Sequence, residues 1–471
     1  MSSSNPTGDP SRRRARPIPA AILASLFVLG FVPVPIGARA ETGTEREEPA
    51  RVDGPAIGLI ATAHPDAAPL LREVLARNPE LARLRAEALA AEAAIAGIAS
   101  WPDPMASLTA FALTPETRVG PQRWSVSVQQ RFPWFGKLAL REQQAAARAV
   151  AARLMVEARA LELVTETRAL LWELSYLDAQ EEILGADRAT LQRYEELARA
   201  RYASGVGLQQ AVIKLQAEIT RLDEHLVDLQ ARRRSMGARL AALRGGAADD
   251  VVPLPALELP APSRLPSLAE LTAEALATRP EVARTRALID AADAAVELAK
   301  KEYRPDLSLG VAYTAVSGRD DAMGRLSPPE GNGDDILGFS LSVPLPVWRR
   351  RLESGVESAA AQRSATEEGL EVLAVAFERD LGDLLARLEG AERQLELIED
   401  LLIVQAEESL RSAEVAYAAG SVGALDLLDA ERTLLDARIS AARLRADLLV
   451  TLSRIEGVVG APLASFPENQ Q

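Results

Sequence analysis

Acidic side chains are the first candidates for chemistry in this chain. Asp426 and Asp429 lie three residues apart at the start of a predicted helix, so both carboxylates project from one helix face. The helix dipole favours carboxylates at this end, so helix capping is one explanation for them. Two further acidic pairs, at residues 320–321 and 334–335, lie in a predicted loop. We interpret these pairs as solvated charge, with weak binding of a divalent cation as the alternative.

No set of residues in the sequence has the pattern of a catalytic site. We find no nucleophile elbow, phosphate-binding loop or metal-ligand cluster. The two histidines, His64 and His225, are far apart in sequence, and cysteine is absent. A lone histidine is most often an ordinary surface or core residue. We therefore predict that the protein is not an enzyme and that it has neither a metal site nor a cofactor.

The elements that position the acidic residues occur twice in the chain. Four landmarks recur in the same order: a helix start with proline and glutamate, a proline–aspartate helix end, a proline–tryptophan segment and a tyrosine-to-glycine turn. They lie at residues 78–81, 102–104, 132–137 and 202–205 in the first half, and at 279–282, 305–306, 345–350 and 417–420 in the second. A repeat of this length indicates a duplicated module rather than a solenoid of small units.

The first 40 residues have the pattern of a secretory signal peptide. Four arginines lie between residues 12 and 16, an apolar stretch follows from 19 to 35, and Ala38-Arg39-Ala40 is a small-residue cleavage site. An uncleaved membrane anchor is the alternative. We assign residues 41–69 to an N-terminal extension. The chain lacks the cysteine that a lipoprotein signal needs, and its net charge of -14 disfavours nucleic acid as a partner.

Long proline-free segments predict two antiparallel helical hairpins. Residues 138–201 are rich in alanine, leucine, glutamate and arginine, which favour helix, and would extend roughly 95 Å. With their returning segments, the hairpins span residues 136–244 and 351–458. Each helix has only a narrow apolar stripe, which in one case consists of Leu395, Ile398, Leu401, Leu402, Ala406 and Leu410. A free-standing coiled coil would have similar helices, so the strands decide between the two interpretations.

Four short segments alternate apolar with small polar residues and predict strands. They occupy residues 107–113, 124–130, 307–313 and 337–343, in two pairs at 105–131 and 306–345. This alternation is typical of a membrane β-barrel, and a half-buried soluble sheet is the alternative. Four strands cannot close a barrel, and lipid does not tolerate open strand edges. We therefore expect several copies to share one barrel, and the strand count alone permits two, three or four.

This order of segments resembles the TolC family of outer-membrane efflux factors. The resemblance covers residues 70–463 and depends on the landmarks above together with Trp101 and the segment 417–431. It implies a mainly α-helical fold with a small membrane β part, in which long antiparallel helical hairpins form an α-barrel. Four strands per chain would complete a twelve-stranded trimeric outer-membrane β-barrel. The implied divisions are two repeats at 70–246 and 267–460, a proline-rich linker at 247–266 and a tail at 461–471.

The same resemblance implies a homotrimer that acts as the exit channel of a tripartite efflux system. Substrates would pass from an inner-membrane pump of the RND type, through a periplasmic adaptor, to the outer membrane and its lipid. The segments around Trp101 and 132–137 are similar to the cobalt-zinc-cadmium branch, but metals, drugs and polypeptides all stay open as substrates. The alternatives are a periplasmic coiled-coil adaptor without a barrel and the outer-membrane component of a type I protein secretion system.

The resemblance assigns functional roles to the two hairpin tips. The tip residues that would dock the adaptor are Gly205, Val206, Gly207 and Leu208 in the first hairpin and Gly420, Ser421, Val422 and Gly423 in the second. In a trimer, Asp426 and Asp429 would each form a ring of carboxylates that favours cations at the periplasmic aperture. Family members close this aperture partly with a charged network, but this chain has Ala211 and Val422 at the corresponding positions. We therefore expect closure by apolar packing, by the side chains of Val206, Leu208, Val422 and Leu425.

Aromatic residues mark the predicted change from strand to helix. In the segment 132–137, proline ends the strand and glycine permits a bend. We predict that Trp134, Phe135 and Trp348 lie at the membrane surface, where aromatic side chains are enriched. Packing in a protein core is the alternative.

Overall fold

The computed structural model of the protein describes residues 55–61, 67–246, 254 and 265–463. The predicted signal peptide, most of the predicted linker, the last residues of the predicted tail and His64 lie outside these residues. The described residues all belong to one compact unit.

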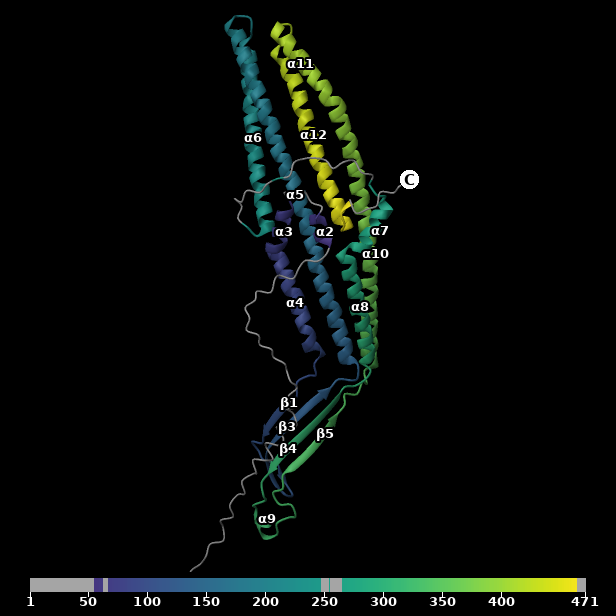
Figure 1. Cartoon of the computed structure of the whole chain (residues 1–471). Helices are drawn as coiled ribbons and strands as arrows, with labels where there is room; N and C mark the ends of the chain where they lie inside the picture. The colour runs from purple at the N-terminus through teal and green to yellow at the C-terminus, as the bar shows by residue number, and fades with distance from the viewer. Residues whose placement is uncertain (1–54, 62–66, 247–253, 255–264, 464–471) are drawn as a thin grey trace, which may run out of the picture. The chain divides into compact units, whose positions relative to one another are not determined.

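Two long helical hairpins make up most of the fold (Figure 1). In the first, α5 (Lys137–Ala203, 67 residues) turns into α6 (Gln209–Arg244). In the second, α10 (Arg349–Leu397) runs through a π-helical turn, η1 (Ile398–Leu402), into α11 (Ile403–Ala419), and α12 (Ala424–Val459) returns. The prediction of long antiparallel helical hairpins is confirmed. In the described part of the chain, no helix combines the length and hydropathy that a membrane span needs.

The π-helical turn corrects the predicted apolar stripe of the second hairpin. Leu395 and Ala406 are buried as the pattern indicates, but Leu401 and Leu402 are exposed. A π turn adds a residue to the helical repeat and so rotates the following positions around the helix axis. The stripe is therefore divided into two buried segments with exposed leucines between them.

Proline sets the start of two shorter helices, α4 (Pro79–Ala99) and α8 (Pro280–Lys301). Proline fits the first helical turn because its missing N–H needs no partner there. The side chain of Asn78 caps α4 by accepting a hydrogen bond from the Leu81 N–H at 3.0 Å. The amide of the same side chain donates to the Leu243 carbonyl of α6 at 2.9 Å. Both α4 and α8 pack along α5 (Figure 1).

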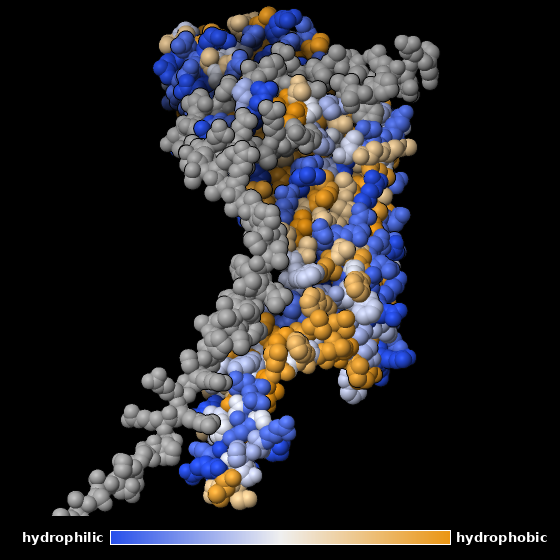
Figure 2. Space-filling view, turned by 60° about the horizontal axis from the view of Figure 1, so that its bottom comes forward, coloured by the Kyte–Doolittle hydropathy of each residue, from blue (hydrophilic) through white to orange (hydrophobic). Residues whose placement is uncertain are grey.

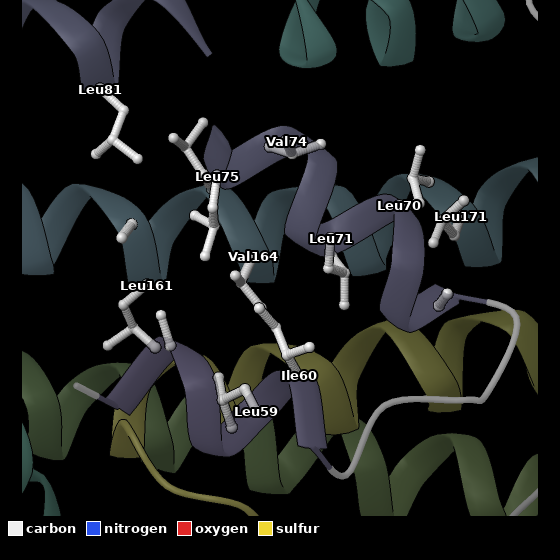
Figure 3. Close-up of a cluster of buried hydrophobic side chains, with 14 of the residues drawn as sticks. Leu59, Ile60, Leu70, Leu71, Val74, Leu75, Leu81, Leu161, Val164 and Leu171 are labelled. Atoms are coloured by element: carbon white, nitrogen blue, oxygen red, sulfur yellow. The ribbon is translucent and has the colours of Figure 1, made fainter. Parts of the chain in front are cut away.

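Three short helices that the sequence did not predict contribute to the core. They are α2 (Pro55–Ala61), α3 (Ala67–Arg77) and α7 (Leu268–Thr278). Helices α2 and α3 pack against α5, and α7 packs against α10 and α12. Figure 3 shows Leu59 of α2 and Leu71 and Val74 of α3 in one buried cluster with Val164 of α5. Residues 55–61 and 67–69, which the sequence analysis places in an N-terminal extension, therefore belong to helices that complete the core around α5.

Buried side chains form separate clusters along the helices instead of one core. One surrounds α5 where α2 and α3 cover it. A second, which we name the inter-hairpin cluster, contains buried residues of α5, α6, α11 and α12, among them Leu191, Leu215 and Leu427. A third joins α7, α10 and α12. This division agrees with the narrow apolar stripes of the helices, which cannot bury one large core.

The strands form an antiparallel sheet in the order β1-β3-β4-β5. Their bounds are Met105–Ala110 for β1, Gly120–Phe132 for β3, Leu307–Val316 for β4 and Ile336–Ser342 for β5. The four predicted strands are present, although β1 is shorter and β3 starts earlier than the alternation indicates. The segments that connect β1 to β3 and β4 to β5 contain further structure, because β2 (Glu116–Thr117) pairs with the start of β3 and α9 (Ala322–Leu326) precedes β5.

The strand register places apolar and small polar side chains on opposite faces of the sheet. Paired residues in an antiparallel sheet project from the same face. One row across the four strands consists of Leu108, Val126, Tyr313 and Leu337. The adjacent row consists of Ser107, Ser127, Ala312 and Gly338. The predicted alternation within each strand therefore continues from strand to strand and makes two distinct faces.

Four elements lie side by side at each of three levels of this unit, which are the sheet, the helices that join the sheet and the helices that form the hairpins. In the sheet the order is β1-β3-β4-β5. Among the helices that join the sheet, α5 packs on α4 and α8, and α8 packs on α10, which gives the order α4-α5-α8-α10. Among those that form the hairpins, α5 packs on α6 and α12, and α12 packs on α11, which gives the order α6-α5-α12-α11.

Candidate functional site

The first hairpin tip, between α5 and α6, is a tight turn that needs two glycines. Gly205 has φ +77°, and the N–H groups of Val206 and Gly207 donate to the Arg201 carbonyl at 3.1 and 2.9 Å. A Cβ at Gly207 would lie 2.9 Å from a backbone nitrogen of α5, so a larger residue would force the turn to shift. The tip holds two apolar side chains in solvent, with Val206 72% and Leu208 73% exposed.

The second tip, between α11 and α12, closes with different contacts. Gly420 has φ +81°, and Ser421 donates from both its N–H and its hydroxyl to the Ala416 carbonyl, at 3.0 and 2.9 Å. Gly423 then precedes α12 with extended backbone. Val422 packs its side chain against the inter-hairpin cluster. The two tips therefore reverse the chain at the predicted residues by different means.

The residues predicted to close the aperture differ in environment. Val422 and Ala211 both pack against the inter-hairpin cluster. Val206, Leu208 and Leu425 are exposed in the single chain. Closure by these four apolar side chains stays a prediction, because three of them are largely exposed in one chain.

Asp426 and Asp429, the predicted acidic ring, are both exposed but have different partners. The Asp426 carboxylate accepts a hydrogen bond from the Gly423 N–H at 2.9 Å and so caps α12. The Asp429 carboxylate has no hydrogen-bond partner among the described residues. Capping therefore accounts for Asp426 but not for Asp429, and the ring itself stays a prediction.

Two polar contacts that the sequence did not predict join the hairpins near their tips. Arg201, at the end of α5, donates to the Tyr417 carbonyl of α11, and its guanidinium carbon lies 4.8 Å from the centre of the Tyr417 ring. The Tyr194 hydroxyl of α5 donates to Glu414 of α11. Burial, and then the hydrogen bond to Glu414, raises the pKa of Tyr194. The repeated turn tyrosine, Tyr417, was a sequence signal for the first contact. The partners in the two contacts are 216 and 220 residues apart in sequence, so no local pattern pairs them.

Asp187 of α5 is a carboxylate buried beside the inter-hairpin cluster, with 8% of its surface exposed. One of its oxygens has no hydrogen-bond partner. Burial, and then the charge of Glu218 on α6, raises the pKa of Asp187 to about 7, while Arg438 on α12 acts in the opposite direction. The sequence signal that we missed is an acidic residue at helical spacing between the buried Leu184 and Leu191.

The junction between sheet and helices holds a buried ion cluster. Lys137, the first residue of α5, is 2% exposed, and its ammonium group lies 2.9 Å from Asp306 and 3.3 Å from Glu302. Arg131 at the end of β3 also contacts Asp306, at 2.6 Å. Burial alone would raise the pKa of Asp306, but hydrogen bonds from Lys137, the Trp134 N–H and Arg131 lower it to about 2. This cluster links β3 and α5 to the segment that precedes β4.

The three predicted interface aromatics lie at the same junction. Trp134 is half-buried and packs edge-on against Phe135, with ring centres 6.0 Å apart. Phe135 and Trp348 are 83% and 76% exposed, so neither lies in a core of this chain. Figure 2 shows hydrophobic residues gathered on the surface near this end of the helical part. Their role as membrane anchors stays a prediction.

The predicted loop with the acidic pairs 320–321 and 334–335 uses two of its four aspartates in its own structure. Asp321 pairs with Arg319 at 2.6 Å and caps α9 through the Gly324 N–H at 3.1 Å. Asp335 accepts from the Tyr313 hydroxyl and from the Val316 N–H. Within the described ranges, no group of three or more histidine, cysteine or acidic residues is placed to hold a metal ion.

A small sheet that continues into paired long hairpins is the fold of outer-membrane channels. The outer-membrane channel OprN has this fold, with a TM-score of 0.71 and 18% sequence identity over 88% of this chain and 94% of that chain. The outer membrane protein VceC from Vibrio cholerae has a TM-score of 0.67 and 21% identity over 84% of this chain and 96% of that chain.

The chain belongs to the outer membrane efflux protein family, whose model matches residues 70–246 and 271–461. It is similar to the pyoverdine export outer membrane protein OpmQ of Pseudomonas putida, at 27% identity over 54% of this chain and 52% of the relative. It is also similar to the cobalt-zinc-cadmium resistance protein CzcC of Cupriavidus metallidurans, at 25% identity over 52% of this chain and 55% of the relative. The chain thus spans about half the length of these relatives. The predicted family is confirmed.

Proposed function

We propose that this chain is one protomer of a homotrimeric outer-membrane channel, the passive exit of a tripartite efflux system. Its partners would be a periplasmic adaptor, which contacts the hairpin tips, and an inner-membrane pump of the RND type. Substrate would cross the periplasm inside the helical part and the outer membrane inside a shared β-barrel. The protein itself would catalyse no reaction.

The unpaired edges of the chain carry this proposal. Elements β1, α4 and α6 lie at one edge of the three levels described above, and β5, α10 and α11 lie at the other. A sheet in lipid cannot keep open edges. When β1 of one copy pairs with β5 of the next, the same head-to-tail contact brings α4 to α10 and α6 to α11. Three copies give a barrel of twelve strands, the number that the family resemblance implies.

The two faces of the sheet support a barrel in this arrangement. Leu108, Phe339 and Leu341 share one face and are exposed. The opposite face carries serine, alanine and glycine, and the hydroxyls of Ser107 and Ser127 lie 2.8 Å apart on it. Membrane barrels place apolar residues toward lipid and polar residues toward the lumen. The resulting lumen would be uncharged along these rows and would discriminate little between substrates.

The hairpin tips support the adaptor contact. Val206, Leu208 and Leu425 present large apolar side chains to solvent at the tips, and a protein partner that covered them would remove that apolar surface from water. The tips also bring Asp426 and Asp429 close to the same end of the molecule, where three copies would form the acidic rings.

We propose no single substrate, because a passive exit needs no binding site for its cargo. The names of the relatives point to different cargoes, namely pyoverdine for OpmQ and cobalt, zinc and cadmium for CzcC. Selection of the substrate would then belong to the pump, and this channel would serve whichever pump the adaptor brings to it.

Engineered cysteines test the head-to-tail assembly directly, since the natural chain has no cysteine. Ile213 near the start of α6 and Val415 near the end of α11 lie at matching distances from the tips, and both are exposed. We expect the double variant Ile213→Cys/Val415→Cys, purified from outer membranes, to give a covalent trimer with a short bismaleimide crosslinker. The two single variants are the matched controls and should run as monomers on a denaturing gel.

Light scattering and planar-bilayer recordings complete the test. A detergent-solubilised trimer that conducts ions agrees with the proposal. A monodisperse monomer that stays soluble without detergent contradicts it and favours a periplasmic coiled-coil adaptor instead.

A further inference from the structure

The two repeats place basic residues differently where a strand passes into a long helix. In the first repeat, Lys137 begins α5 and is buried against Asp306 and Glu302. In the second repeat, Arg349, Arg350 and Arg351 begin α10, and all three are exposed. We name these three residues the arginine triplet. No carboxylate among the described residues pairs with the triplet, so the fold of one chain leaves its charge without a partner.

Helix stability does not explain the arginine triplet. The N-terminal end of a helix carries partial positive charge, so arginine is disfavoured in its first turn. The first turn of α10 contains no acidic residue that would compensate. Three cations at this position therefore oppose the helix dipole, and an anionic partner outside the chain would remove that cost.

The residues that precede the arginine triplet indicate where this partner lies. Leu345, Val347 and Trp348 are large, apolar and exposed. Phe339 and Leu341, on the apolar face of β5, come shortly before them and are exposed as well. The chain therefore passes from an apolar strand face, through an exposed tryptophan, to a group of cations. Tryptophan is enriched at the membrane–water interface, and arginine reaches from there toward lipid headgroups.

We propose that the arginine triplet binds the phosphates of anionic phospholipids in the periplasmic leaflet of the outer membrane. This proposal rests on the proposed function, because it requires the sheet to span that membrane. Guanidinium groups bind phosphate through paired N–H donors, and three adjacent copies of the group suit a headgroup layer better than a single small anion. In a trimer the surface would occur three times around the barrel. It would fix the depth of the barrel in the lipid and the angle of α10.

Native mass spectrometry of the full-length protein measures this preference. The trimer, released from detergent, is offered equal amounts of dioleoyl phosphatidylglycerol and dioleoyl phosphatidylethanolamine, which differ in net charge but not in acyl chains. Each basic residue near an anionic surface contributes about 1 kcal/mol, or roughly fivefold in affinity. We expect wild-type protein to retain phosphatidylglycerol over phosphatidylethanolamine by at least about tenfold.

The charge-removed variant Arg349→Gln/Arg350→Gln/Arg351→Gln should lose this preference. Glutamine keeps the helix propensity, and the arginines make no side-chain hydrogen bond to any described residue that the change would break. The chain offers a matched control in Arg232, Arg233 and Arg234, a second run of three arginines on α6. Arg232 and Arg233 pair with Asp228 and Asp178, at 2.7 and 2.6 Å. The corresponding glutamine variant of this run should keep the lipid preference.

Six results separate the explanations. Loss of the lipid preference in the triplet variant, but not in the control variant, supports the proposal. A wild-type preference that does not change when inorganic phosphate is added at about 10 mM, a typical buffer concentration, also supports it. Equal retention of both lipids by the wild type overturns it, and so does a preference that the triplet variant keeps. A triplet variant whose trimer dissociates without any change in lipid preference identifies a carboxylate of the neighbouring copy as the partner. A wild-type chain that is monomeric and does not enter bilayers of phosphatidylethanolamine alone contradicts the proposed function itself.

Discussion

The strand–helix junction and the inter-hairpin cluster each bury a carboxylate, but they neutralise it in opposite ways. Asp306 at the junction contacts Lys137 and Arg131, so the ionised form is favoured. Asp187 beside the inter-hairpin cluster has an oxygen without a partner and lies near the like charge of Glu218, so the protonated form is favoured. The junction therefore joins the sheet to the helices with a fixed ion cluster. The contact between the hairpins instead changes its stability with pH.

The largest expected effect is at the junction. Asp306→Asn leaves the ammonium group of Lys137 buried without its main counter-charge, which typically costs about 3 kcal/mol or more. We expect a clearly lower midpoint of thermal unfolding for the detergent-solubilised protein, measured by circular dichroism. Asp320→Asn, in the exposed loop, is the control and should leave the midpoint unchanged. An unchanged midpoint for Asp306→Asn would mean that the cluster contributes nothing to the fold.

The pH dependence of the junction follows from the same carboxylate. The pKa of Asp306 lies at about 2, below the ordinary value of 3.8. Its contribution to stability is therefore complete above about pH 4 and is lost as the pH falls toward 2. Asp306→Asn should remove this part of the acid sensitivity in unfolding measured between pH 5 and pH 2.

A second, smaller effect is expected between the hairpins, with the opposite sign. The pKa of Asp187 is raised from 3.8 to about 7, so the packed state binds a proton more tightly than the unfolded chain does. The stability that the protonated Asp187 carboxyl contributes is fully present below about pH 4 and is lost as the pH rises through 7. Asp187→Asn should therefore stabilise the protein at pH 8, by roughly 2 kcal/mol, and have little effect at pH 4. The measurement is unfolding of both proteins across this pH range.

Asp223→Asn is the matched control for Asp187. Asp223 is a partly exposed carboxylate of α6 that pairs with Arg188 of α5 at 2.6 Å, so it spans the same two helices without being buried. Its substitution should not produce stabilisation at pH 8. If Asp187→Asn destabilises equally at pH 4 and pH 8, the carboxylate is ionised throughout and the contrast with Asp306 is wrong.

A third effect concerns the contact between the tips. Arg201→Ala removes both the hydrogen bond to the Tyr417 carbonyl and the guanidinium–ring contact. At this partly buried site the two contacts are together worth on the order of 1 kcal/mol, so we expect the open fraction of the channel in planar bilayers to rise about fivefold. Arg199→Ala is the control, because Arg199 pairs with Glu195 of its own helix, one turn away, and not with the second hairpin among the described residues. Equal gating in both variants would mean that the Arg201–Tyr417 contact does not hold the tips together.

The smallest effect on stability is expected for the acidic residues of α12. The same residues are expected to have the most specific effect on conduction. Asp426→Ala should destabilise the protein by about 1 kcal/mol through loss of the cap, whereas Asp429→Ala should not. Both variants should weaken cation selectivity, measured as the reversal potential in a salt gradient, if three copies form carboxylate rings. Unchanged selectivity in the double alanine variant would remove the ring hypothesis.

Periodicity and local residue preferences were enough to predict the long helices and the four main strands of the fold. The proline-free segments predicted the helical hairpins, and the alternation at 124–130 and 337–343 predicted strands whose apolar residues share one face. The glycines of the tips predicted both turns, because positive φ at Gly205 and Gly420 is a local requirement. These features depend on neighbours within a few residues, so the order of the residues contains them.

The sequence by itself determined the duplicated order of helix, strand pair and hairpin, and with it the family. Only the tertiary structure decided where charge is buried, because Lys137 and Asp306 are 169 residues apart, and no local pattern relates them. The same holds for the packing of α2 and α3 on α5 and for the exposure of Leu401 in the π turn. Such contacts arise from the packing of elements that are distant in sequence, and their energies depend on burial, which the order of residues does not specify.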